Sequence, residues 1–211
     1  MIKYCLFDLD GTLVKSETGI IRSAMYALDN MGIKEYDMDK LKHFIGPSLY
    51  DTFAHVYGMS EEDANRAIEL YREVYEDKNI YEVSLYDGVV ELLEMIRRSG
   101  RRIFLVTSKP YNMAYRVLSY LGIDIYFEDI YSPELTDHTS DKSQLIARFL
   151  EEMQIGDLSS VAMIGDKIYD ISAANACGIK SIGVSYGYGD RTELAGATCV
   201  VDSPEEVYRR L

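Results

Sequence analysis

Short apolar runs and amphipathic stretches alternate along most of the chain. Apolar runs bounded by turn residues predict buried strands, and they occupy residues 4–7, 102–107, 125–131, 161–165, 180–184 and 198–201. Between them, an apolar residue at every third or fourth position predicts helices, at residues 89–98, 113–121, 142–153, 168–176 and 204–211. This alternation is typical of an α/β protein with a doubly wound (Rossmann-like) parallel sheet.

One interval is too long for this alternation. A strand–helix–strand unit needs about 30 residues, yet far more separate the first two strands, and the excess is helical in character. It contains no convincing strand, and its helical patterns lie at residues 20–31, 36–44, 49–57 and 61–78. We therefore expect an inserted all-α cap domain, residues 16–83, on a core domain of residues 1–15 and 84–211, with linkers near 14–18 and 80–87. An insertion at the carboxyl edge of a sheet can act as a lid.

Composition narrows the class of partner. The 211 residues are 47% hydrophobic and carry a net charge of -13, which repels nucleic acids and anionic membranes. No stretch approaches the ~20 apolar residues of a membrane span, and the first residues do not predict a signal peptide. Three widely spaced cysteines fit free thiols in a reducing compartment. We expect a cytoplasmic monomer or homodimer that binds neither nucleic acid nor membrane.

The most informative residues are two carboxylates at the end of the first strand. Asp8 and Asp10 follow the apolar run and precede a Gly-Thr turn. In an open α/β sheet, ligands bind beyond the carboxyl ends of the strands. Two carboxylates held close together repel each other, and burial adds to the cost. A cation, usually Mg²⁺ where all ligands are oxygens, relieves that cost. A calcium loop is a poor fit because Gly11 comes too early in the motif.

Two further segments offer groups that bind anions. Thr107 closes a predicted strand and is followed by Ser108 and Lys109, so a hydroxyl and backbone N–H groups lie before a helix. Lys142 follows a polar loop, residues 137–141, and opens a predicted helix. A cation is unfavourable for the helix dipole at that end, which favours a functional role over ordinary surface charge.

A fourth segment repeats the first pattern. Asp166 ends another apolar run, and Asp170 lies one helical turn later on the same face. In order and spacing, the four segments resemble the four signatures of the haloacid dehalogenase-like phosphohydrolases, here Asp8-Leu9-Asp10-Gly11-Thr12-Leu13-Val14, Thr107, Lys142 and Gly165-Asp166 with Asp170.

This resemblance implies a Mg²⁺-dependent phosphatase with an aspartyl-phosphate intermediate. It implies that Asp8 is the nucleophile and Asp10 the general acid/base, while Thr107 and Lys142 bind the phosphate. The resemblance also implies further substrate contacts, from Gly11, Thr12, Ser108, Lys109 and, in the cap, Gly46.

The metal ligands implied by the resemblance come from three positions. They are the carboxylates of Asp8 and Asp166 and the backbone carbonyl of Asp10. Asp170 is expected either to bind the metal through water or to orient Lys142.

The chain is most similar to the phosphoglycolate-phosphatase branch of this family, which includes 5′-nucleotidase-like members. The substrate is expected to be a small phosphorylated metabolite, and the fold does not choose which. Two alternatives stay open. A β-phosphoglucomutase-type phosphotransferase uses the same parts, but usually has Glu-Asp where Gly165-Asp166 stands. A non-catalytic protein that binds a phosphorylated metabolite is the other, and the presence of Asp10 and Asp166 counts against it.

Overall fold

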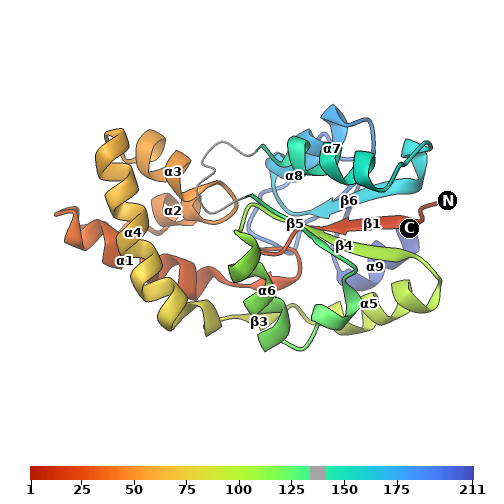
Figure 1. Cartoon of the computed structure of the whole chain (residues 1–211), viewed down its shortest axis with the longest axis horizontal. Helices are drawn as coiled ribbons and strands as arrows, with labels where there is room; N and C mark the ends of the chain where they lie inside the picture. Colours follow the sequence, from red (N-terminus) through yellow and green to blue (C-terminus); the bar gives the residue numbers. More distant parts are fainter. Residues whose placement is uncertain (134–140) are drawn as a thin grey trace.

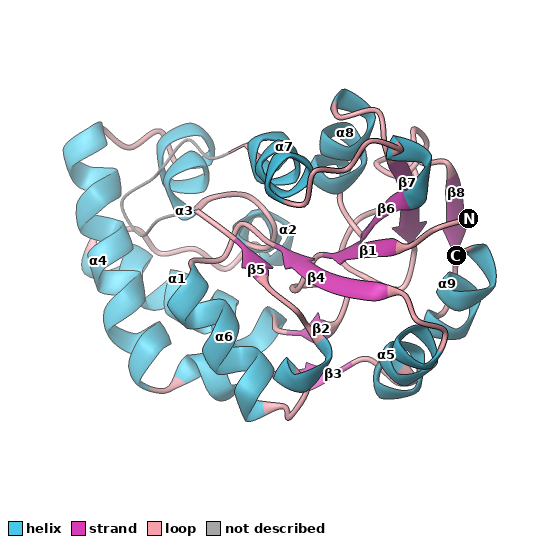
Figure 2. Ribbon diagram, turned by 45° about the vertical axis from the view of Figure 1, so that its right-hand side comes forward, coloured by secondary structure: helices cyan, strands magenta, loops and turns pink. Residues whose placement is uncertain are grey.

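A parallel sheet between two layers of helices forms the core of the molecule (Figures 1 and 2). The computed structural model describes residues 1–133 and 141–211, so most of the polar loop before Lys142 lies outside the described residues. Six strands pair in the order β5-β4-β1-β6-β7-β8, all parallel. This confirms the predicted doubly wound α/β fold.

The elements have the following bounds. The strands are β1 (Tyr4–Phe7), β2 (Val14–Lys15), β3 (Ser84–Leu85), β4 (Arg102–Val106), β5 (Ile130–Tyr131), β6 (Val161–Gly165), β7 (Lys180–Val184) and β8 (Cys199–Val201). The α-helices are α1 (Glu17–Asn30), α2 (Met38–Leu41), α3 (Leu49–Asp51), α4 (Glu61–Asp77), α5 (Val89–Arg98), α6 (Tyr111–Tyr120), α7 (Lys142–Glu152), α8 (Ile168–Ala176) and α9 (Pro204–Arg210). Short turns of other helix types are η1 (Lys42–Phe44), η2 (Thr52–Val56), η3 (Asn79–Tyr81), η4 (Asp124–Tyr126) and η5 (Leu158–Ser160).

The first strand lies at the centre of the sheet. Phe7, the last residue of β1, is in register with Leu105 of β4 and Ile164 of β6. The residues that follow these three strands therefore lie side by side at one edge of the sheet. The topology alone brings the loop after β1 next to the loops after β4 and β6.

Side chains of the central strands alternate between two apolar layers. Cys5 and Phe7 point into the layer that contains the buried residues of α5, α6 and α9. Leu6 points into the opposite layer, where α7 and α8 pack. A strand buried on both faces needs an uninterrupted apolar run, which is why residues 4–7 carry no polar alternation.

The chain between β2 and β3 forms a helical unit, defined here as α1 to η3 (residues 17–81). It lies beyond one end of the sheet (Figure 1), and α1 packs along α4. Its two connections to the core pair with each other as an antiparallel ribbon, in which Val14 is opposite Leu85 and Lys15 opposite Ser84. The expected linkers are therefore one hydrogen-bonded structure and not two separate tethers.

Several predicted boundaries are wrong. The strand expected over residues 125–131 is only Ile130–Tyr131, because a 3-10 turn, η4, occupies its start. Ile125 in this turn is 66% exposed, so the apolar run does not mark a buried strand there. Helix α6 begins at Tyr111, two residues before the prediction, because the exposed Tyr111 breaks the apolar periodicity that marked the helix.

Two predicted helices of the helical unit contain turns of other helix types. The pattern at 36–44 forms α2 and η1, because the side chain of Asp37 accepts N–H hydrogen bonds from the first turn and starts the helix there. The pattern at 49–57 forms α3 followed by a π-helical turn, η2. Gly58, with φ +66°, then ends this segment.

Gly19 allows α1 to approach η3 closely. A Cβ atom at this position would lie 2.1 Å from the carbonyl oxygen of Asn79. We expect Gly19→Ala to lower the free energy of unfolding by about 1–3 kcal/mol through overpacking, although alanine is the better helix former. Denaturant unfolding measures this loss. Gly156→Ala is the matched control, because a Cβ there has no neighbour within 4 Å; equal midpoints for the two variants would contradict the close packing.

Candidate active site

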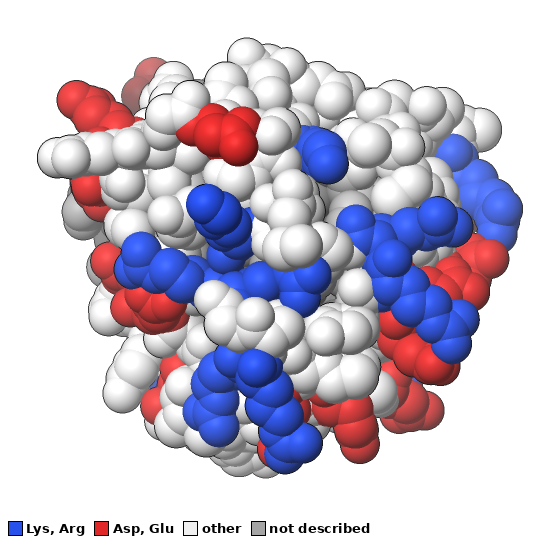
Figure 3. All heavy atoms as spheres, turned by 90° about the vertical axis from the view of Figure 1, so that its right-hand side faces the viewer, with Lys and Arg blue, Asp and Glu red and all other residues white. Residues whose placement is uncertain are grey.

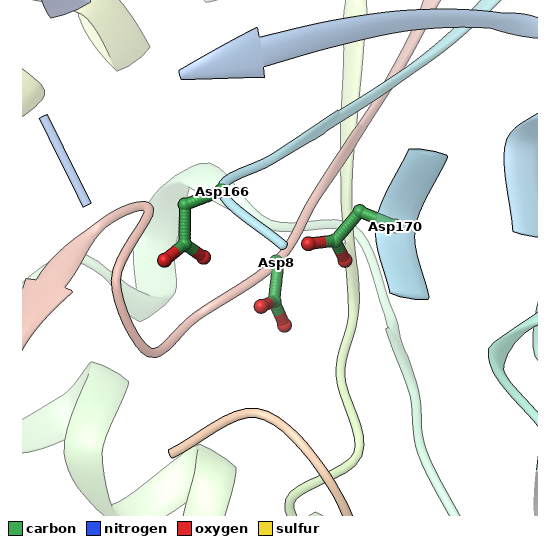
Figure 4. A group of neighbouring side chains, drawn as sticks. All are labelled: Asp8, Asp166 and Asp170. Atoms are coloured by element: carbon green, nitrogen blue, oxygen red, sulfur yellow. The ribbon is translucent and has the colours of Figure 1, made fainter. Parts of the chain in front are cut away.

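Three buried carboxylates meet at the carboxyl edge of the sheet. Asp8 follows β1, Asp166 follows β6, and Asp170 lies in the first turn of α8. Figure 4 shows these side chains directed toward one another. One oxygen from each carboxylate lies within 4.8 Å of the other two, and the three residues are 0–4% exposed. This arrangement could hold a metal ion, and it unites three of the predicted site residues.

Lys142 is the cation of this cluster. Its Nζ lies 2.9 Å from Oδ1 of Asp8 and 2.6 Å from Oδ1 of Asp170. The residue opens α7 and is itself buried. With every group ionised, three carboxylates face one ammonium, so the cluster carries a net charge of -2. A divalent cation would neutralise that excess.

Glycines let the backbone pass directly beside the acidic cluster. A Cβ on Gly11 would lie 2.2 Å from Oδ2 of Asp166, and Gly11 also has φ +85°. A Cβ on Gly165 would lie 2.1 Å from Cγ of Asp170, and one on Gly187 would lie 2.4 Å from Cβ of Asp166. These positions have no room for a side chain, so the loops close around the carboxylates.

Tyr188 joins the acidic cluster to the start of the helical unit. Its backbone N–H donates to Oδ2 of Asp166 at 2.8 Å. Its hydroxyl accepts hydrogen bonds from the backbone N–H groups of Ser16, at 2.8 Å, and Glu17, at 3.0 Å. These bonds satisfy donors at the start of α1, which begins three residues earlier than the sequence predicts. No short pattern could predict this contact, because 172 positions separate Tyr188 from Ser16.

The hydroxyl-bearing residues hold the loops around the site. Oγ1 of Thr12 donates to Oδ1 of Asp166 at 3.3 Å. Oγ1 of Thr107 accepts the backbone N–H of Lys109 at 3.2 Å, and Thr107 is buried. Ser108 follows Thr107 in the chain, and both residues line a cavity between the core and the helical unit.

Asp10 lies apart from the three clustered carboxylates and has its own cation. Its Oδ1 is 2.8 Å from Nζ of Lys109. The same ammonium donates to the hydroxyl of Tyr75 in α4, also at 2.8 Å. Gly46 lies near the core as well, because a Cβ there would be 3.4 Å from Cγ of Lys167. Both contacts connect the core to the helical unit, and neither Tyr75 nor Lys167 carried a signal in the sequence.

Burial and crowding change the protonation of the cluster. Burial raises the pKa of Asp8 to about 8; Lys142 opposes this rise, and Asp170 and Asp166 add to it. Burial and then Asp170 raise the pKa of Asp166 to about 7, against the N–H bond from Tyr188. Burial alone would lower the pKa of Lys142, but Asp170 and Asp8 raise it above its ordinary value. Lys142 therefore stays charged, and the carboxylates lack enough positive charge around them.

A cavity of about 620 Å³ lies between the core and the helical unit. Asp8, Asp10, Thr107 and Lys142 line it from the core. The opposite wall is largely apolar and aromatic, with Ser48, Asp51, His55 and Arg72 as its polar members. Its apolar and aromatic side chains include Ile20, Phe44, Leu49, Ile68, Tyr71 and Tyr75. The site thus combines a charged end with a large, mostly apolar space.

Basic side chains on the outer surface gather far from this cavity. Figure 3 shows Lys and Arg on the face where the two termini lie. Three arginines of the elements at this end are paired with carboxylates: Arg98 with Glu94, Arg102 with Glu128 and Arg209 with Glu205.

Membrane-spanning potential is absent from the helices of residues 1–133 and 141–211. None of these helices is both long enough and apolar enough to cross a bilayer.

Comparisons with a family model, with known sequences and with solved structures agree with one another. A family model described as haloacid dehalogenase-like hydrolase matches residues 5–184. A 5′-nucleotidase of Pseudomonas aeruginosa is 39% identical over 189 residues, which cover 90% of this chain and 85% of that protein. The crystal structure of a predicted phosphatase from Clostridium acetobutylicum is 35% identical, with a TM-score of 0.94, and the match covers 100% of this chain and 98% of that one.

A relative with a different named activity is also similar. The tyrosine-protein kinase PtkA of Mycobacterium tuberculosis is 34% identical over 184 residues, which cover 87% of this chain but only 62% of that protein. Related proteins thus have different named activities, so the activity of this chain has to be inferred from the residues of its site.

The raised pKa values make stability depend on pH and metal. Between about pH 4 and pH 8, Asp8 and Asp166 hold more protons in the folded chain than in the unfolded one. The free energy of unfolding of the metal-free protein should therefore fall as pH rises through this window. A bound cation replaces these protons, so saturating Mg²⁺ should raise the melting temperature by roughly 5 °C at pH 8 and by less at pH 5. Thermal unfolding with and without Mg²⁺ measures both values.

Asp166→Asn is the control for this measurement. It removes one carboxylate and should abolish most of the Mg²⁺-dependent rise at pH 8. A rise that is equal at both pH values, or equal in the variant, would contradict a cation site at this cluster.

Proposed function

The chain belongs to the haloacid dehalogenase-like hydrolase family and is a phosphatase; we propose that it hydrolyses small phosphate monoesters with Mg²⁺, through an aspartyl-phosphate intermediate. One observation carries the proposal. The acidic cluster of Asp8, Asp166 and Asp170 shares the ammonium of Lys142 at the charged end of a cavity that also contains Asp10.

The donor set fits a magnesium ion. Carboxylate oxygens are the ligands that Mg²⁺ prefers, and the cluster is short of positive charge. Asp8 and Asp166 would bind the ion through their carboxylates, with the backbone carbonyl of Asp10 as the third protein ligand, while Asp170 holds Lys142. When bound, the ion supplies charge neutralisation for the phosphate and for Asp8.

In the first step, a carboxylate oxygen of Asp8 attacks phosphorus. A bond forms between this oxygen and phosphorus while the bond from phosphorus to the leaving oxygen breaks. Asp10 delivers its carboxyl proton to the leaving oxygen. The phosphate oxygens are held by Lys142 and by the hydroxyl and N–H groups near Thr107 and Ser108. These groups lie at the charged end of the cavity.

In the second step, water releases the phosphate. Asp10, now ionised, removes a proton from the water that attacks phosphorus, and the bond to Asp8 breaks. Phosphate leaves, and both carboxyl groups return to their starting state. We propose that residues 16–83, which contain the helical unit, form a cap on a core of residues 1–15 and 84–211. This cap excludes bulk water during the first step.

The cavity favours a large leaving group. A volume of about 620 Å³ falls in the range of pockets that enclose drug-sized ligands. Glycolate, a two-carbon acid, would leave most of it empty. Apolar and aromatic walls suit a ring-bearing group such as a nucleoside, and a relative at 39% identity is named a 5′-nucleotidase. We therefore place nucleoside monophosphates ahead of phosphoglycolate.

Removal of the nucleophile tests the mechanism. Asp8→Asn keeps the size of the side chain and should fold, but it should lose at least about 1,000-fold in kcat. Hydrolysis of 4-nitrophenyl phosphate with Mg²⁺ measures the loss. Asp129→Asn is the matched control, because Asp129 is exposed and lies beyond β4, outside the cavity lining. Full activity of Asp8→Asn would refute the nucleophile, and ligand binding without any wild-type turnover would favour a non-catalytic binding protein.

Substrate size gives a separate prediction. Across a panel of phosphate esters, kcat/KM for the best nucleoside monophosphate should exceed that for phosphoglycolate by at least about tenfold, because more apolar surface is buried in the cavity. Release of inorganic phosphate measures both rates. A higher kcat/KM for phosphoglycolate would contradict this ranking and leave the mechanism in place.

A further inference from the structure

Lys109 links the proposed general acid/base to the helical unit. Its Nζ lies 2.8 Å from Oδ1 of Asp10 and 2.8 Å from the hydroxyl of Tyr75. Asp10 belongs to the core loop after β1, whereas Tyr75 belongs to α4. One ammonium thus bridges two parts of the chain that face each other across the cavity.

This bridge is shielded from solvent. The side chain of Lys109 is 8% exposed, that of Asp10 is 12% exposed, and Tyr75 is buried. The ammonium lies 5.3 Å from the centroid of the Tyr75 ring, on the side of its hydroxyl. A charge-assisted hydrogen bond in such surroundings is short and directional, so it restricts the rotation of the Asp10 carboxyl group.

The backbone of Lys109 is fixed as well. Its N–H donates to Oγ1 of Thr107, which holds the loop after β4 in place. With the main chain fixed at one end and Tyr75 at the other, the ammonium has a defined position. Oδ1 of Asp10 is then engaged, and Oδ2 is the oxygen that can face the leaving group.

We propose that Lys109 is a positioning residue, which together with Tyr75 orients the Asp10 carboxyl group toward the leaving-group oxygen when the helical unit lies against the core. This inference rests on the proposed function. The proton that reaches the leaving oxygen comes from Asp10, while the bond from phosphorus to that oxygen breaks.

The contacts favour this role over the direct substrate binding expected for Lys109 from the sequence. Two hydrogen bonds of its ammonium go to protein groups. A lysine that binds substrate contributes to every phosphate ester in a similar way. A lysine that positions the acid matters most when the leaving oxygen is basic and needs a proton. The two roles therefore differ in their dependence on the leaving group.

The experiment compares kcat/KM for 4-nitrophenyl, phenyl and benzyl phosphate, whose leaving oxygens become steadily more basic. Lys109→Met keeps the apolar stem and removes the ammonium. We expect its loss on benzyl phosphate to exceed its loss on 4-nitrophenyl phosphate by roughly tenfold or more, within the 10²–10⁴-fold range of general acid catalysis. Tyr75→Phe removes one hydroxyl only and should show the same trend with smaller losses.

The double variant tests whether the two residues act together. If Tyr75 works through Lys109, Lys109→Met/Tyr75→Phe should lose no more than Lys109→Met alone. Arg116→Met is the matched control, because Arg116 of α6 donates to the Glu76 carbonyl and the Tyr81 hydroxyl but not to Asp10. It breaks a core contact to the helical unit and should change all three rates by the same factor.

The outcomes separate the proposals. Losses that are equal across the three esters for Lys109→Met and Tyr75→Phe would overturn the positioning role, as would the same leaving-group trend in Arg116→Met. Because Tyr75→Phe is nearly isosteric, it decides the question if Lys109→Met fails to fold. No Mg²⁺-dependent hydrolysis of any ester by the wild-type protein would overturn the proposed function and, with it, this inference.

Discussion

Excess negative charge in a buried place is the constraint on which the rest of the structure depends. Asp8, Asp166 and Asp170 share one ammonium, from Lys142, at the end of the central strands. Isolated carboxylates are not tolerated in such surroundings, so every neighbouring segment is arranged around them. Loops with glycine come within contact distance, and backbone N–H groups point inward. The excess negative charge of this cluster is therefore balanced from the solvent, either by a bound cation or by protons.

Much of the core could be predicted because its information is local. An apolar run that stops at a carboxylate, as before Asp8 and Asp166, predicts both a buried strand and the position where that strand ends. Parallel pairing then brings these ends together whatever the details of the helices. The doubly wound fold was predictable for the same reason. Lys142 and Asp170 were expected at the site from the resemblance to the family signatures, and both lie in the first turns of their helices.

The remainder depends on contacts between distant residues, which no short pattern encodes. Tyr188 determines where α1 begins, although it lies in a loop near the other end of the chain. Tyr75 looks like any apolar residue of an amphipathic helix, and only the fold brings its hydroxyl to Lys109. The prediction of a strand before β5 was wrong for a different reason. Its apolar residues are partly exposed, so hydrophobicity there did not measure burial.

The ribbon of β2 and β3 has a consequence for how such a molecule can change over time. Lys15 and Ser84 are direct partners, so the polypeptide leaves the sheet and comes back at a single point. The sheet is therefore insensitive to the length of the excursion, since closing a longer loop costs only about 0.6 kcal/mol per doubling. Whole modules could be exchanged at this junction while the charged residues at the strand ends keep their places. Ligand preference could then diverge between descendants without any alteration of the reacting groups.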